Sequence, residues 1–152
     1  DLDAWGPGAH AGTFRGNQLA MASGIVVMRK VGDPGFLAEV SRKGDMMMDR
    51  IRRLQQEVSI IGDVRGRGLM FGVEFIDPNG PLDLMGVPEP SGKVATLVQR
   101  GCFENGFIME KGGRNGSVMR CLCALNISDA DIDAAMTIFE KVVREVDERY
   151  RN

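Results

Sequence analysis

The hydrophobic residues of this sequence change their spacing along the chain, from the period of a helix to that of a strand and back again. Between Pro34 and Val58 the apolar residues recur at intervals of three, four and seven positions, which predicts one long amphipathic helix. Over residues 69–76 they alternate with other residues, which predicts a strand with one buried face. We therefore expect an α/β chain of the α+β kind, with a small and mainly antiparallel sheet covered by helices on one face.

Five further elements complete the predicted order. A helix over residues 17–31 begins at Asn17, and two more begin after Ser91 and Ser128, because all three residues are of the types that cap helix N-termini. Residues 106–110 and 116–125 predict two short strands around a glycine-rich turn. The stretch 77–90 holds four of the six prolines and predicts a surface loop. The expected order is two helices, a strand, a helix, two strands and a helix.

Composition excludes two classes of partner. The chain has 152 residues, of which 43% are apolar, which suffices for the core of one compact domain. Its net charge is −2, and Lys and Arg are scattered among acids instead of forming a stripe, so a nucleic-acid partner is not expected. No apolar run approaches the ~20 residues of a membrane-spanning helix, so no membrane association is expected.

Cysteine and histidine are too few to predict a metal site. The chain has three cysteines and one histidine, His10. Cys121 and Cys123 have neither a second cysteine pair nor a histidine nearby, whereas structural zinc normally needs four such ligands. We expect free thiols in a reducing cytoplasm and no bound metal. His10 and Trp5 are interpreted as structural residues of a glycine-rich N-terminal loop.

The stretch "HAGTFRGNQ", residues 10–18, combines groups that bind phosphate. It offers the hydroxyl of Thr13, the cation of Arg15 and backbone N–H groups beside Gly12 and Gly16, all shortly before a predicted helix. Such groups can satisfy phosphate oxygens near a helix start. Gly-Thr and Gly-Asn are also common in turns, so the residues alone leave an ordinary loop open.

Longer stretches resemble a known enzyme family. "PGAHAGTFRGNQLAMASG" closely resembles the segment that follows the catalytic lysine in class III (ornithine-type) pyridoxal-phosphate-dependent aminotransferases. "GDVRGRGLMFGVEF" is similar to a strand of their small domain, and "GGRNGSVMRCLCALNIS" to the segment with their carboxylate-binding arginine. The resemblance covers essentially the whole chain in order. Within the family, diaminobutyrate–2-oxoglutarate aminotransferases are the most similar, and the "DPNGPLDLMG" loop contributes to that likeness.

The resemblance implies a fold, a cofactor and two site residues. The chain would be the carboxy-terminal portion of a fold-type I enzyme, with residues 1–30 linking to a large cofactor-binding domain and residues 31–152 forming the small domain. Thr13 matches the threonine that hydrogen-bonds the phosphate of pyridoxal phosphate from the neighbouring subunit of a homodimer. Arg120 matches the arginine that grips the α-carboxylate of 2-oxoglutarate or glutamate, a two-point contact that lysine makes less well. From the residues alone, pairing of Arg120 with an acid such as Glu110 is the favoured interpretation.

The chain also departs from the family pattern. The family continues from this arginine into a Pro-Pro-Leu turn, whereas this chain has Cys123-Ala124-Leu125, which predicts a looser turn after Arg120. None of its five lysines lies in the context of the Schiff-base lysine, so no catalytic residue is assigned and the chain by itself is expected to be inactive.

Two functions remain open, besides a pseudo-enzyme that keeps only phosphate binding at Thr13. The resemblance implies that the whole protein transfers an amino group between L-2,4-diaminobutyrate and 2-oxoglutarate, giving aspartate semialdehyde and glutamate. The alternative is a free-standing, non-catalytic interaction domain derived from the same fold. The missing lysine is the feature that keeps this alternative open.

Overall fold

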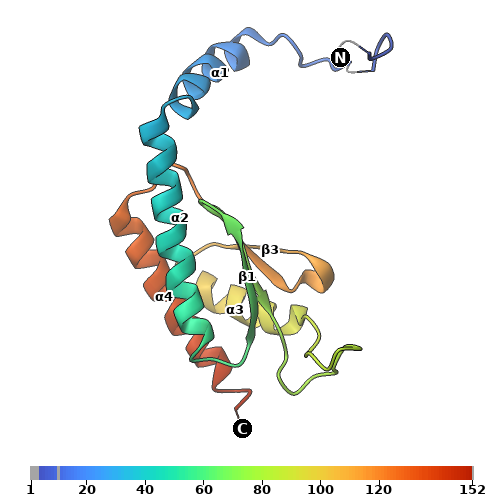
Figure 1. Ribbon diagram of the computed structural model, residues 1–152, viewed down its shortest axis with the longest axis vertical. Coiled ribbons are helices and arrows are strands. Elements are labelled where there is room, and N and C mark those ends of the chain that lie inside the picture. The colour runs from blue at the N-terminus through green and yellow to red at the C-terminus, as the bar shows by residue number, and fades with distance from the viewer. Residues whose placement is uncertain (1–3, 10, 152) are drawn as a thin grey trace. The chain divides into compact units, whose positions relative to one another are not determined.

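The computed structural model describes residues 4–9 and 11–151, and His10 therefore lies outside the described residues. The chain divides into two compact units, Asp1–Leu37 and Ala38–Asn152, which we call the first and second units (Figure 1). No helix in residues 4–9 and 11–151 is long and apolar enough to cross a membrane.

The first unit contains the N-terminal loop and helix α1, which spans Gln18–Val31. The predicted cap is confirmed, because the Asn17 side chain accepts a hydrogen bond from the backbone N–H of Ala20 at 3.1 Å. No residue of α1 is buried, and Leu19 is 81% exposed. An apolar helix that buries nothing presents its hydrophobic side chains to the surroundings.

Helix α2, Pro34–Gln55, supplies one wall of the core in the second unit. Its buried residues are Gly44, Met47, Met48, Ile51 and Leu54. The predicted stripe is therefore confirmed from its middle to its end, whereas Leu37 is exposed and lies outside it. The helix also stops before Val58, which is buried in the segment that follows.

The sheet has four strands, β1 Ile61–Arg67, β2 Met70–Phe75, β3 Glu110–Gly112 and β4 Val118–Leu122. Their order is β1-β2-β4-β3, and every neighbouring pair is antiparallel. The antiparallel sheet is as expected. The prediction of a single strand before residue 77 was wrong, because β1 and β2 form a hairpin through Gly68 and Leu69. The strand expected at 106–110 begins only at Glu110.

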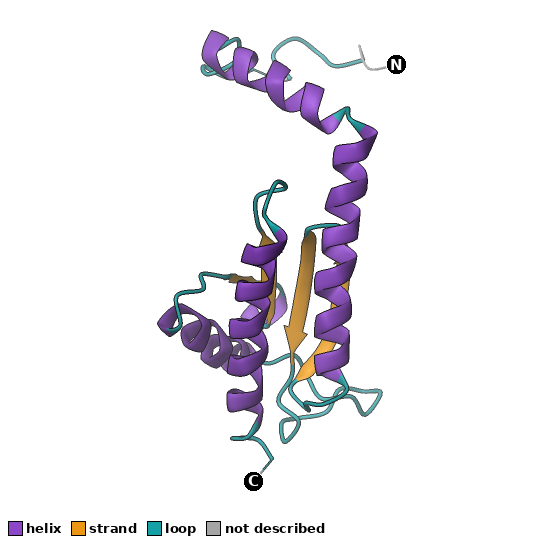
Figure 2. Ribbon diagram, turned by 90° about the vertical axis from the view of Figure 1, so that its left-hand side faces the viewer, coloured by secondary structure: helices purple, strands orange, loops and turns teal. Residues whose placement is uncertain are grey.

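One face of the sheet is covered by helices, as predicted (Figure 2). Phe71, Val73 and Phe75 of β2 are buried in one cluster with residues of α2, of α3, Gly92–Glu104, and of α4, Asp129–Asp147. The rings of Phe75 and Phe139 lie 6.4 Å apart in this core. Burial of such large apolar side chains is the main stabilising contribution to the second unit.

The remaining predictions concern caps and loops. The side chains of Ser91 and Ser128 accept hydrogen bonds from the third residue of α3 and α4, which confirms both caps. Residues 77–90 contain no strand or helix, in agreement with the predicted loop. Phe103 of α3 is 66% exposed.

Candidate functional site

The sheet face opposite the helices brings together residues from all four strands. Arg65 of β1, Gly72 of β2, Arg120 of β4 and Glu110 of β3 form one row across the sheet. Side chains alternate along a strand, so this row points away from the buried side chains of β2. We call this surface the open face, and it comprises Asp63, Arg65, Arg67, Met70, Gly72, Glu74, Glu110, Gly112, Val118, Arg120 and Leu122.

Arg120 is held on the open face by its neighbour on β3. Its Nη2 donates to Oε1 of Glu110 at 2.5 Å, and the two side chains are 46% and 53% exposed. The guanidinium lies above the backbone of Gly112, where a Cβ atom would sit 3.3 Å from Nη2. The pairing that the residues alone allowed is therefore present. Because a guanidinium has five N–H donors, the remaining ones can still bind a second carboxylate.

The other arginine in this row is more fully engaged. Arg65 donates to Asp63 at 2.6 Å and to Glu74 at 2.9 Å. The hydrogen bonds from Arg65 to Glu74 and then to Asp63 raise the pKa of its guanidinium. Arg65 is thus neutralised by two acids, whereas Arg120 pairs with one.

A cavity of about 270 Å³ opens beside Arg120. Arg120 and Glu110 line it together with the two cysteines of β4 and its following turn, Cys121 and Cys123. The rest of its wall is apolar and includes Met47 of α2. One cation at the edge of an apolar cavity suits a small molecule that carries a carboxylate.

Thr13 lies in the first unit, in a turn before α1. The backbone N–H of Arg15 donates to the carbonyl oxygen of Gly12 at 3.1 Å and closes this turn. Gly16 has φ +74°, a left-handed conformation that favours glycine. Thr13 is exposed, and within the described part of the chain its hydroxyl has no hydrogen-bond partner. Thr13 and Arg120 belong to different units, so each is described in its own surroundings.

Two of the lysines are engaged elsewhere in the second unit. Lys43 donates to the carbonyl oxygen of Ile127 at 2.6 Å, and Lys111 to the hydroxyl of Thr96 at 2.6 Å. All five lysines lie within the described residues, and none lines the cavity beside Arg120. Within residues 4–9 and 11–151, no three His, Cys, Asp or Glu side chains are grouped as a metal site requires.

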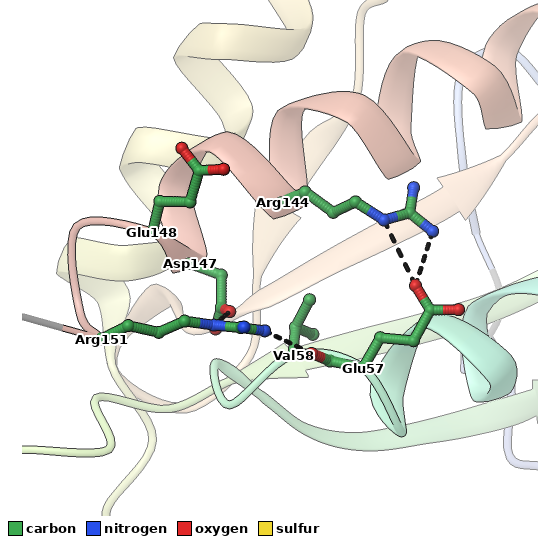
Figure 3. A pocket seen from close by; sticks show the side chains of 6 residues that line it. All are labelled: Glu57, Val58, Arg144, Asp147, Glu148 and Arg151. Carbon is green, nitrogen blue, oxygen red and sulfur yellow. Dashed lines mark hydrogen bonds and ion pairs between the residues drawn. The ribbon is translucent and has the colours of Figure 1, made fainter.

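A second cavity, of about 290 Å³, is lined by Val58 and by charged residues, several of which pair with one another (Figure 3). Asp147 of α4 accepts from the backbone N–H and the hydroxyl of Ser59, at 2.7 and 2.8 Å, and from Arg151 at 2.5 Å. Arg144 pairs with Glu57 at 2.8 Å. These contacts tie the C-terminal end of α4 to the segment before β1, and they indicate a structural role.

Asp147 is the residue that sequence reasoning missed. It is 1% exposed, although it is charged. Burial raises the pKa of its carboxyl, but the hydrogen bonds from Ser59 and Arg151 outweigh that effect and hold the pKa below its usual value. Its position four residues after Val143, on the buried stripe of α4, was the available signal.

Comparisons with known proteins agree on one family. The sequence matches the profile of the family described as "Aminotransferase class-III" over residues 2–143. It is 44% identical over 149 residues to the diaminobutyrate–2-oxoglutarate aminotransferase of Rhizobium meliloti, with 95% of this chain and 32% of that protein covered. It is 38% identical over 143 residues to the enzyme of the same name from Haemophilus influenzae, with 94% and 32% covered. The chain thus spans about a third of the length of these relatives.

A solved structure shares the fold of the chain. The ornithine aminotransferase from Toxoplasma gondii superposes with a TM-score of 0.75 at 28% identity, over 99% of this chain and 32% of that one. That structure has pyridoxal phosphate at its active site with partial occupancy.

Proposed function

Because the chain belongs to the class-III aminotransferases, we propose that it is the carboxy-terminal part of a pyridoxal-phosphate-dependent aminotransferase. In this proposal residues 1–30 link to a large cofactor-binding domain and residues 31–152 form the small domain. The whole protein acts as a homodimer or higher homo-oligomer in the cytoplasm. The chain spans about a third of the two relatives, which supports its place in a longer enzyme. Its three cysteines are free, which supports the cytoplasmic location.

The proposed reaction moves an amino group between L-2,4-diaminobutyrate and 2-oxoglutarate, with aspartate semialdehyde and glutamate as products. Two relatives at 44% and 38% identity carry that activity in their names. 2-Oxoglutarate and glutamate carry an α-carboxylate next to the reacting carbon, so a site for them needs a cation that holds this group.

The observation that carries the proposal is the half-exposed Arg120 on the open face, beside an apolar cavity. Its planar guanidinium can hold a carboxylate at two points. Glu110 already occupies Nη2, so an incoming carboxylate either displaces Glu110 or binds the remaining N–H groups. Arg120 therefore orients the substrate, and Glu110 sets how strongly it does so.

The residues of this chain fit only part of a site for pyridoxal phosphate. The exposed hydroxyl of Thr13, in a turn stabilised by Gly16, can donate to a phosphate oxygen across a subunit interface. When bound, pyridoxal phosphate supplies the electron sink that makes amino transfer possible. The five lysines of this chain take no part in the proposed chemistry, so the isolated chain is inactive.

A substitution in the full-length enzyme tests the role of Arg120. We expect Arg120→Ala to raise the KM for 2-oxoglutarate by roughly tenfold to a hundredfold, because a charge-assisted contact worth about 1.5–3 kcal/mol is lost. Arg65→Ala is the matched control on the same sheet face and should change this KM by less than about threefold. An unchanged KM in Arg120→Ala contradicts the assignment.

The interaction-domain alternative makes a different prediction. The exposed apolar residues of α1 favour it, since they offer a surface to another protein. The test is the absorbance of the protein as expressed, between about 330 and 430 nm, where enzyme-bound pyridoxal phosphate absorbs. A full-length protein with this chromophore supports the aminotransferase, and a free-standing chain without it supports the alternative.

A further inference from the structure

Two cysteine side chains meet at the end of β4. The Sγ atoms of Cys121 and Cys123 lie 3.8 Å apart. Cys121 is buried on the helix-covered face of the sheet, and Cys123 is half-buried just beyond the last strand residue, Leu122. Both side chains line the cavity beside Arg120, so a small molecule can approach them from that side.

The backbone around this pair allows the two sulfur atoms to approach further. A disulfide needs a distance of about 2.0 Å, so the sulfur atoms must move about 1.8 Å closer. Cys121 is fixed, because it pairs with Phe71 in the β2–β4 ladder. Cys123 follows the strand and lies outside that ladder, in a segment without regular secondary structure. The movement required can therefore be made by Cys123.

The two thiols differ in reactivity. Burial, together with the neighbouring Cys123, raises the pKa of the Cys121 thiol to about 12, which keeps it protonated at neutral pH. Cys123 is the more accessible of the two. Thiol–disulfide exchange needs an accessible thiolate to begin and a neighbouring thiol to complete it, and Cys123 and Cys121 are placed for these two roles.

We propose that Cys121 and Cys123 form a reversible thiol–disulfide site that is oxidised by low-molecular-weight disulfides. The Cys123 thiolate attacks one sulfur of the small disulfide, breaks its S–S bond and releases one thiolate. Cys121 passes its proton to that thiolate and attacks Sγ of Cys123, which releases the second small thiolate. The two protein thiols lose two electrons, and the small disulfide is reduced to two thiols.

The site would make the turn after Arg120 responsive to the ratio of thiol to disulfide around the protein. It does not depend on the aminotransferase assignment, because it requires only the two thiols and their surroundings. Cys102 is a matched internal control, since it is fully buried in α3 and burial raises its pKa to about 12.

Peptide mapping tests the proposal directly. The purified protein is equilibrated with oxidised and reduced glutathione, alkylated, and digested with trypsin, which cleaves after Arg120 and Lys141 and isolates both cysteines in residues 121–141. With excess oxidised glutathione we expect most of this peptide to lose two hydrogens and to regain them on reduction. The peptide with Cys102 should remain alkylated, with no glutathione adduct.

Two variants test the order of the steps. In Cys121→Ala the glutathione adduct on Cys123 should persist, because no second thiol resolves it. In Cys123→Ala we expect no adduct on Cys121. Three results overturn the proposal: a doubly alkylated wild-type peptide at every glutathione ratio, a lasting glutathione adduct or a link to another peptide in the wild type, or an adduct on Cys121 in Cys123→Ala.

Discussion

At the scale of single residues, the buried carboxylate of Asp147 is the side chain on which several contacts depend. It accepts three hydrogen bonds from Ser59 and Arg151 while almost fully buried. A buried charge is tolerated only when hydrogen-bond donors or an opposite charge compensate its loss of hydration. Ser59 and Arg151 in turn use the Asp147 carboxylate as their acceptor.

We expect Asp147→Ala to lower the free energy of unfolding by about 2–4 kcal/mol, because the N–H of Ser59 and the Arg151 guanidinium lose their acceptor. Urea denaturation measures the change. Glu145→Gln is the control, since Glu145 is an exposed acid of the same helix and its loss should alter stability by less than about 0.5 kcal/mol. Equal effects of both substitutions would mean that Asp147 contributes nothing through its burial.

The same residue predicts a pH dependence. The pKa of Asp147 is lowered in the folded chain, so its contribution to stability is full above the unfolded pKa of about 3.9 and is lost as the pH falls through the folded pKa. The difference in free energy of unfolding between wild type and Asp147→Asn should therefore stay constant above about pH 5 and shrink as the pH falls below about 4. A difference that stays constant or grows on acidification contradicts the assigned direction of the pKa shift.

Residue patterns predicted which side chains are buried better than they predicted which polar groups meet. Apolar stripes identify Ile51 and Phe139 as core residues, because residues at helical spacing lie on the same face of their helix. The partners of Asp147 come from Ser59 and Arg151, and no local rule brings Ser59 to the end of α4. Long-range polar contacts follow from tertiary packing and are not encoded in a window of sequence.

At the scale of elements, α2 makes a close contact with the β1–β2 hairpin. A Cβ atom on Gly44 would lie 2.1 Å from the carbonyl oxygen of Gly68, well inside van der Waals contact. The missing side chain of Gly44 therefore allows the backbone of the hairpin to approach α2 closely. This contact offsets the destabilising effect of glycine in a helix interior.

Gly44→Ala should lower the free energy of unfolding by roughly 2 kcal/mol or more, since the clash with the hairpin exceeds the gain of about 1 kcal/mol in helix propensity. Gly24→Ala in α1 is the matched control, because nothing lies within 4 Å of its added methyl group and the propensity gain acts alone. Thermal unfolding of the chain compares the two. A stabilised Gly44→Ala would show that the helix and hairpin do not touch.

Among the strands of the described sheet, β1 was missed by sequence reasoning. Its apolar residues are Ile61 and Val64 alone, a bulge follows Ile61, and Gly62 and Gly66 remove further side chains from the pattern. The caps at Asn17, Ser91 and Ser128 were predictable because a side-chain oxygen and the first helical N–H groups interact within three residues. Local signals thus predicted the helices, whereas β1 has few apolar residues and is specified by its pairing with β2.

At the scale of the whole molecule, the unburied apolar residues of α1 predict association. Leu19, Met21, Ile25, Val26 and Met28 are each more than half exposed. We expect the chain to self-associate, with a sedimentation coefficient that rises with concentration. The double substitution Ile25→Lys and Val26→Glu should reduce this rise. A strictly monomeric profile of the unsubstituted chain at high concentration would contradict the prediction.

Of the candidate site, the position of Arg120 on a strand was predictable from the sequence. The motif around Arg120 placed it on a strand, and its pairing with Glu110 follows from the register of β3 and β4. Thr13 sits in an exposed turn, so the role proposed for it depends on groups beyond its own surroundings. The proposed role of Thr13 therefore cannot be derived from the pattern of its own segment.

The open face of the sheet has one further consequence, for the speed at which a ligand arrives. Its formal charges cancel, because three arginines, Arg65, Arg67 and Arg120, stand beside three acids, Asp63, Glu74 and Glu110. A surface whose formal charges cancel does not attract an anion over long distances. If the proposed function holds, we expect the encounter with a dicarboxylate to proceed by diffusion without electrostatic steering and to change little with ionic strength. Discrimination would then begin on contact, when the carboxylate competes with Glu110 for the guanidinium of Arg120.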